Sequence, residues 1–188
     1  SATAVLTIKG GEAGDTITGG TKNDIIHGNG GNDTITLTAG GNDTVEGGAG
    51  DDKIDAGSTL TASDSIDGGE GDDTLIVTSL SSAALAGVTN VETLAFNGTV
   101  TLAKDLSFDT LDLTNGSSAD SVTFASGYTK AMTVNLEAGD TVVNSAKITL
   151  AVTANADELE SADSTTVTGS STAVDSMTIK ATSSTVAT

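Results

Sequence analysis

The chain has 188 residues, a formal net charge of −19, and neither cysteine, proline, tryptophan nor arginine. So acidic a chain excludes nucleic acid as a partner and disfavours anionic membrane surfaces, because it has almost nothing with which to neutralise phosphates. The lack of cysteine excludes disulfides and thiol chemistry, and no apolar run approaches the roughly 20 residues of a transmembrane helix. The start at Ser1-Ala2-Thr3 shows no initiator methionine or signal peptide, which is typical of an interior or processed piece of a longer chain.

A short unit recurs seven times over residues 10–76: a glycine-rich loop, an aspartate, one residue and one aliphatic residue. Its copies span residues 10–18, 19–27, 28–36, 37–46, 47–55, 56–67 and 68–76. The aspartates are Asp15, Asp24, Asp33, Asp43, Asp52, Asp64 and Asp73. The aliphatic residue two positions after each is Ile17, Ile26, Ile35, Val45, Ile54, Ile66 or Leu75. This regular spacing differs from the periodicity of amphipathic helices and predicts a repeat architecture.

Each unit reads as one minimal β-strand between sharp turns. The aliphatic residue and its neighbours point to opposite faces of the strand, and glycine or asparagine supplies the positive φ angles of the turns. One unit cannot bury its aliphatic side chain alone. We therefore expect a parallel β-roll with two units per coil, in which Ile17, Ile35 and Ile54 face Ile26, Val45 and Ile66.

Stacking the units also stacks the aspartates. Carboxylates about 4.8 Å apart repel strongly unless a cation lies between them, and calcium takes six to eight oxygen ligands from carboxylates and carbonyls. The seven aspartates are therefore candidate calcium ligands, paired between alternate units. We expect well-formed pairs Asp15–Asp33, Asp33–Asp52 and Asp52–Asp73, and distorted or empty sites at Asp24–Asp43 and Asp43–Asp64, where the loops are degenerate.

These units resemble the GGxGxDxUx nonapeptides of the repeats-in-toxin (RTX) family. Units 47–55 and 68–76 match fully, whereas Ala13 and Lys22 replace the third glycine, Asn29 replaces the second, and the sixth unit keeps little beyond Asp64 and Ile66. The resemblance implies a calcium-binding parallel β-roll, type I secretion, and folding outside the cell where calcium is plentiful. A flexible acidic linker is the alternative, against which the fixed phase of the aliphatic residues argues.

The composition changes near residue 78, which predicts a calcium-binding roll over 1–78, a junction over 79–90 with a helical turn at 82–86, and a Thr/Ser/Ala-rich solenoid over 91–188. Alternating runs predict strands at 91–96, 99–103, 109–114, 121–125, 131–136, 147–153, 164–169 and 176–181. The acid-x-aliphatic pattern survives at Glu92, Asp109, Asp120, Asp140 and Asp175. We therefore expect a continuing all-β solenoid whose calcium loops are replaced by ordinary turns. An antiparallel β-sandwich is the rival.

No catalytic set is evident in the sequence, and we expect no enzymatic activity. His27 is the only histidine and is expected at the surface, and no HExxH motif is present. The acidic pairs 51–52 and 72–73 suit calcium ligation, or solvation of the first member, better than acid–base chemistry. Thr16, Thr34 and Thr44 suggest an ice-binding ladder, but Ile25, Lys53 and Ser65 interrupt it.

The features together favour an extracellular structural protein of the bacterial surface, whose calcium-dependent folding leads to self-assembly into a surface layer or filament. It resembles the calcium-binding parts of surface-layer proteins and secreted fibres. The expected partners are further copies of the chain and a cell-surface polysaccharide bound through regions outside it. The alternative is a calcium-binding spacer or secretion module of a larger adhesin, toxin or exoenzyme. Open strand edges, which need capping or pairing, favour assembly.

Overall fold

The computed structural model describes residues 4–78, 80–81, 83–102, 107–114, 120–125, 129–136, 140–144, 150–155, 166–169 and 177–182. The chain divides into two compact units, Ser1–Ala95 and Phe96–Thr188. Each unit is described by itself below. The sequence-based boundaries at residues 78 and 90 are different ones and stay a prediction.

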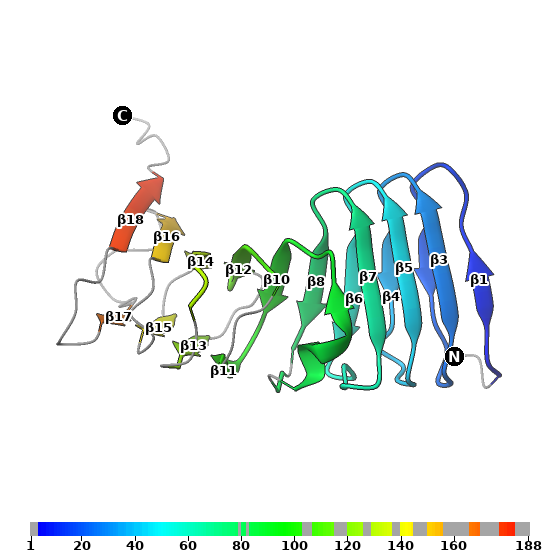
Figure 1. Ribbon diagram of the computed structural model, residues 1–188, viewed down its shortest axis with the longest axis horizontal. Helices are drawn as coiled ribbons and strands as arrows, with labels where there is room; N and C mark the ends of the chain where they lie inside the picture. Colours follow the sequence, from blue (N-terminus) through cyan, green and yellow to red (C-terminus); the bar gives the residue numbers. More distant parts are fainter. Residues whose placement is uncertain are drawn as a thin grey trace, which may run out of the picture. The chain divides into compact units, whose positions relative to one another are not determined.

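Two parallel sheets form the first unit (Figure 1). One contains β1 (Thr7–Lys9), β3 (Ile25–Gly30), β5 (Thr44–Ala49), β7 (Ser65–Glu70) and β9 (Val88–Thr89). The other contains β2 (Thr16–Thr18), β4 (Thr34–Thr36), β6 (Lys53–Gly57), β8 (Thr74–Val77) and β10 (Thr93–Phe96). Successive strands alternate between the sheets, so each coil contributes one strand to each, as expected for a β-roll. A 3-10 helix at Ala84–Gly87 lies close to the predicted turn at 82–86, of which residue 82 is outside the described residues.

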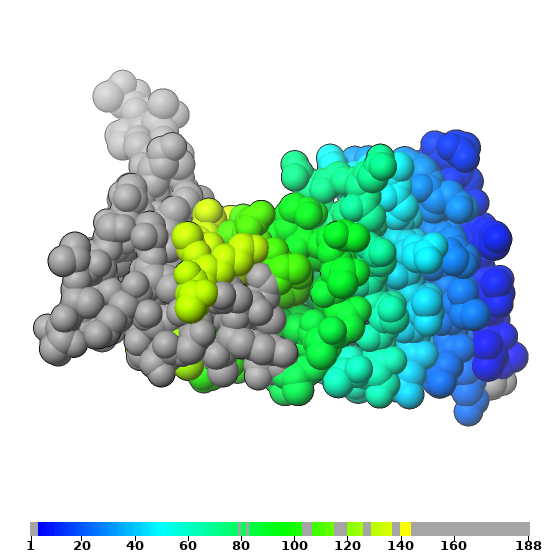
Figure 2. Space-filling model, in the orientation of Figure 1, coloured from blue at the N-terminus to red at the C-terminus, as the bar shows by residue number. Residues whose placement is uncertain are grey.

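The core consists of the predicted aliphatic rows. In one sheet Ile17, Ile35, Ile54 and Leu75 pair in register, and in the other Ile26, Val45, Ile66 and Val88 do so. All eight side chains are at most 6% exposed. Successive coils lie directly against one another in the space-filling view (Figure 2). This confirms the predicted register of two units per coil.

The outward faces of the roll carry mixed side chains. Thr16 pairs with Thr34, which pairs with Lys53, whereas Thr44 lies in the opposite sheet between Ile25 and Ser65. The three threonines that suggested an ice-binding ladder therefore do not form one row, because alternate units belong to different sheets.

The second unit is also built from parallel strands. One sheet contains β11 (Thr99–Leu102), β13 (Ser121–Phe124), β15 (Thr141–Asn144) and β17 (Thr166–Gly169), which pair in that order. The second set contains β12 (Thr110–Asp112), β14 (Met132–Leu136), β16 (Leu150–Asn155) and β18 (Met177–Thr182). These parallel pairings are those of a solenoid, as predicted, and not those of the rival antiparallel sandwich. Among the described strands of this unit, β15 is the one that the alternating runs did not predict. Asp175 lies outside the described residues.

Candidate metal site

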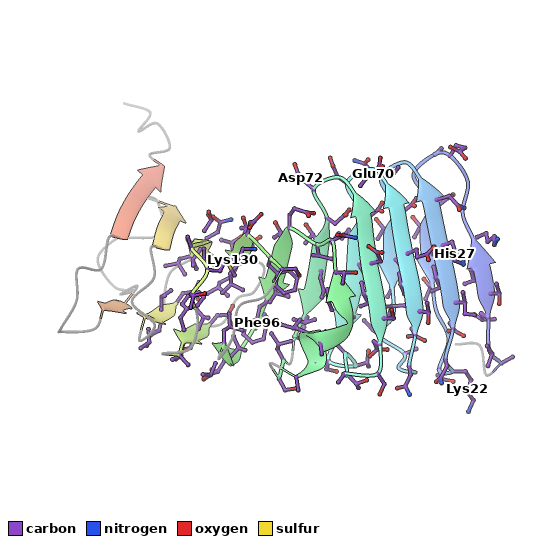
Figure 3. All side chains as sticks on the ribbon, in the orientation of Figure 1. Lys22, His27, Glu70, Asp72, Phe96 and Lys130 are labelled. Carbon is purple, nitrogen blue, oxygen red and sulfur yellow. The ribbon has the colours of Figure 1, made fainter. Side chains whose placement is uncertain are left out.

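The structure places the seven predicted aspartates in two rows at opposite edges of the roll. The first column, defined as Asp15, Asp33, Asp52 and Asp73, directly precedes β2, β4, β6 and β8. The second column, defined as Asp24, Asp43 and Asp64, directly precedes β3, β5 and β7. Figure 3 shows the two edges: Asp72 marks the first and Lys22 the second. Aspartates of alternate units are thus neighbours, as the two-unit coil requires.

Hydrogen bonds tie each column together along the stack. In the first column the backbone N–H groups of Asp15, Asp33 and Asp52 donate to Oδ1 of Asp33, Asp52 and Asp73, at 2.7, 2.8 and 2.8 Å. In the second column Asp24 and Asp43 donate in the same way to Asp43 and Asp64, at 2.9 and 2.7 Å. Every carboxylate so held accepts a bond from the preceding coil. Its position and orientation are therefore fixed by the fold.

The second carboxylate oxygen distinguishes three first-column aspartates from the others. Asp15, the first member of that column, is unlike them, because its Oδ2 accepts from the Gly11 N–H at 2.6 Å. Oδ2 of Asp33, Asp52 and Asp73 is buried without a hydrogen-bond partner, and these residues are at most 2% exposed. In the second column Oδ2 of Asp24 accepts from the Gly20 N–H at 2.5 Å, and Oδ2 of Asp64 accepts from the Thr61 N–H at 2.7 Å. An ionised oxygen buried without a partner is strongly unfavourable. The first column therefore requires a cation or a proton.

Glycines bring further oxygens to the first column. A Cβ atom at Gly28 would collide with Oδ2 of Asp33 and with the carbonyl oxygen of Gly47. A Cβ at Gly47 would likewise collide with Oδ2 of Asp52 and with the carbonyl oxygen of Gly68. Glycine is thus required at both positions, because there the carboxylate of the same unit and a backbone carbonyl of the next coil approach each other closely.

This oxygen-only set fits calcium. In the described part of the chain no three Asp, Glu, His or Cys side chains gather at one point. A cation in the first column would therefore take its remaining ligands from backbone carbonyl oxygens, which calcium accepts readily in flexible geometry. The orphaned Oδ2 atoms of Asp33, Asp52 and Asp73 are the atoms that such a cation would pair.

The pKa values of the buried aspartates also indicate that the fold needs a positive charge beside them. Burial, with the nearby charges of Asp52 and Glu92, raises the pKa of Asp73 to about 6. Burial also raises the pKa of Asp52, and that of Asp43 in the second column, above the ordinary value of an aspartate. The ionised form of these groups is therefore unfavourable in the folded chain unless positive charge compensates it.

Sequence reasoning missed an outer ladder beside the first column. The Asp51 N–H donates to Oδ1 of Asn32, and the Asp72 N–H donates to Oδ1 of Asp51, both at 3.0 Å. The side chains of Asn32 and Asp51 thus each accept a bond from the backbone of the following coil. The signal was present in the sequence, as an Asn or Asp directly before the column aspartate in units two to five and seven.

Two further predicted residues have clear places. His27 is on the outward face of β3 with Nδ1 2.7 Å from Oε2 of Glu46, and its side chain is partly exposed. Asp67 is the last residue of the sixth unit, so the repeat predicts it at a strand end. It lies instead in the middle of β7, where its Oδ1 accepts from the Asn90 side chain at 2.8 Å. The strand is longer than predicted because the glycines after Asp67 continue the pairing with β5.

The second unit repeats part of the first-column arrangement. The Gly98 N–H donates to Oδ1 of Asp120 at 2.6 Å, and the Asp120 N–H donates to Oδ1 of Asp140 at 2.9 Å. Oδ2 of Asp120 is buried without a partner, and burial raises the pKa of Asp120. The ordinary turns predicted directly before both residues fall on 115–119 and 137–139, outside the described residues.

Comparison with known proteins identifies the repeats. The family model of the RTX calcium-binding nonapeptide repeat (4 copies) matches residues 9–41, 38–58 and 60–77. No curated protein matches the chain, and no described helix is long and apolar enough to span a membrane. RTX repeats are calcium-binding motifs of secreted bacterial proteins, and their β-roll is a structural fold. Residues 9–77 therefore carry RTX calcium-binding nonapeptide repeats, as their sequence predicts.

Proposed function

We propose that the chain is an extracellular structural protein that folds on binding calcium and assembles with further copies at the bacterial surface. The observation that carries the calcium part is the row of buried, unpartnered Oδ2 atoms on Asp33, Asp52 and Asp73. The seven column aspartates are the proposed ligands, each shared between neighbouring coils. Calcium supplies the positive charge that the fold itself lacks.

Calcium acts on folding through the repulsion between the stacked acids. Two unit charges about 4.8 Å apart repel by roughly 3–4 kcal/mol at an effective dielectric constant of about 20. A column contains several such pairs, and the net stability of a domain is only about 5–15 kcal/mol. The roll is therefore expected to unfold at low calcium, as inside a cell, and to fold outside it.

Two features support assembly. Strands β1 and β2 are the outermost strands of their sheets, and an outermost strand offers unpaired backbone groups to another chain. Among the described residues the exposed large apolar side chains are Val5, at 63%, and Ile25, at 41%. Val5 precedes the outermost strand β1. Ile25 lies on the outward face of the adjoining strand β3, where it pairs with Thr7 and its N–H donates to the carbonyl of Leu6 at 2.9 Å. The edge thus offers apolar contact as well as hydrogen bonds.

Charge opposes the contact unless calcium is present. Chains that each carry −19 repel one another, so assembly should need more calcium than folding does. Sedimentation velocity across a calcium titration, with circular dichroism on the same samples, tests this order. Chelation should dissolve the assemblies before the roll unfolds or together with it.

A matched variant tests the proposed contact. Val5→Thr/Ile25→Thr should fold at the same calcium concentration as the unchanged chain but assemble less, because threonine already occupies the outward position beside Ile25 in β5. Thr44→Ser, on the same ladder away from the edge, is the control. A chain that is calcium-loaded, folded and strictly monomeric at high concentration would refute assembly and favour the spacer module.

A further inference from the structure

The loop that joins β9 to β10 adopts the position of a calcium loop although the RTX match ends at residue 77. Val88 and Thr89 pair with Ile66 and Asp67, which places Asn90 beside Gly68. The Thr93 N–H donates to the Asp73 carbonyl at 2.9 Å, as the Thr74 N–H donates to the Asp52 carbonyl. Glu92 therefore occupies, one coil further on, the place of Asp73.

This loop is three residues shorter than a repeat loop, and its residues compensate for the difference. The six residues 68–73 are replaced by residues 90–92. Asn90 makes the tighter turn with a positive φ of 48°, which asparagine tolerates better than most residues. Glutamate has one methylene more than aspartate, and its Oε2 reaches the Asp73 N–H at 2.8 Å. That bond equals the one from the Asp52 N–H to Oδ1 of Asp73.

The oxygens of a first-column layer are repeated here. A Cβ at Gly68 would collide with Oδ2 of Asp73 and with the carbonyl oxygen of Asn90. One coil earlier, a Cβ at Gly47 would likewise collide with Oδ2 of Asp52 and with the carbonyl oxygen of Gly68. Oδ2 of Asp73 is buried without a partner, and Asp73 is fully buried. The layer thus presents a carboxylate aimed at the next coil, a carbonyl and a second carboxylate.

We propose that Asp73, the Asn90 carbonyl and Glu92 form a calcium site beyond the RTX repeats, which closes the first column. The inference rests on the proposed calcium binding of that column. Hard oxygen ligands with two carboxylates suit calcium, and the negative charge of Glu92 beside Asp73 requires such a counter-charge. Calcium at this site also links β9 and β10 to the repeats, so that their folding becomes calcium-dependent.

Glu92→Gln is the direct test, because the amide oxygen can still accept the Asp73 N–H while the charge is removed. Native mass spectrometry of the full chain should show one bound calcium fewer than in the unchanged protein. Glu70→Gln is the matched control: Glu70 is the exposed last residue of β7 in the preceding coil, and the loss of its charge should leave the calcium count unchanged. Equal calcium counts and affinities in Glu92→Gln and the unchanged chain would overturn the inference and leave the column intact.

A measurement on the unchanged chain covers the case in which Glu92→Gln does not fold. Crystals grown with terbium, which replaces calcium, should show an anomalous peak within calcium-ligand distance of Asp73, the Asn90 carbonyl and Glu92. Peaks at Asp33 and Asp52 without one at Glu92 would overturn this site alone. A chain that binds no calcium or terbium at all would instead refute the proposed function.

Discussion

Protonation of the buried aspartates should partly replace calcium binding in stabilising the roll. Asp73 is the residue at which this effect can be measured most clearly. The pKa of Asp73 is about 6 in the fold, against an ordinary value of 3.8, mainly because its carboxylate is buried. The difference corresponds to about 3 kcal/mol, or roughly a 100-fold change in the folding equilibrium. A raised carboxyl pKa stabilises the folded state below about pH 4 and loses that contribution as the pH rises through about 6. Acid should therefore favour the calcium-free roll.

The assay is far-UV circular dichroism in excess chelator between about pH 7 and pH 5, above the sequence pI of about 4.1. The unchanged chain should gain β-structure as the pH falls. Asp73→Asn, which has no charge to bury, should start with more β-structure at neutral pH and gain less on acidification. With saturating calcium the order reverses, because the variant lacks a ligand.

Two results would refute the reasoning. One is identical pH profiles for the unchanged chain and Asp73→Asn in chelator, which would mean that the Asp73 charge costs nothing in the fold. The other is a loss of β-structure on acidification. Asp67→Asn is a suitable control, since it replaces an acid of β7 that stands outside both columns and should leave the profile unchanged.

The columns lead to three further predictions. Residues 10–76 should be disordered in chelator and β-rich in calcium, and an unchanged far-UV spectrum across a calcium titration would contradict this. Asp52→Ala should remove the two sites that it shares with its neighbours in the first column, whereas Asp67→Ala should remove none; isothermal titration calorimetry that finds equal losses would contradict the register. Gly47→Ala should lower the free energy of unfolding of the calcium-bound roll by about 1–3 kcal/mol in urea, because its Cβ would collide with backbone and carboxylate oxygens. Gly11→Ala is the control and should cost little, because the nearest atom to its Cβ would be 3.7 Å away.

The roll could be predicted from sequence because two sets of residues keep the same repeat at a fixed offset. The aliphatic residues fix which face of each strand is buried, and a slip of one residue would expose all of them. The aspartates fix the spacing of the coils, so that the sequence alone pairs Asp33 with Asp15 and Asp52. The second unit has no glycine-rich repeat sequence and keeps the alternation with isolated acid-x-aliphatic steps. Strand β15 was missed there because the adjacent Val142 and Val143 interrupt the alternation of its run.

The details of the site could not be predicted in the same way, because they depend on how each loop folds and on neighbours in the next coil. The second oxygen of Asp24 finds an N–H donor in its own loop, that of Gly20, whereas the second oxygen of Asp33 finds none. The loop before β10 falls where the predicted junction meets the part expected to have ordinary turns. Its resemblance to a calcium loop appears only when Asn90 and Glu92 are stacked on the preceding coil.

The difference between the columns implies that the two edges of the roll depend on calcium to different degrees. In the second column Asp24 and Asp64 already receive backbone N–H donors on both carboxylate oxygens, counting the bonds from Leu6 and Asp43. Such donors stabilise an ionised carboxylate without a metal. In the first column Asp33, Asp52 and Asp73 have a donor for one oxygen only. Withdrawal of calcium therefore leaves uncompensated charge chiefly along the first column, and unfolding should begin at that edge, where three buried oxygens have lost their partner.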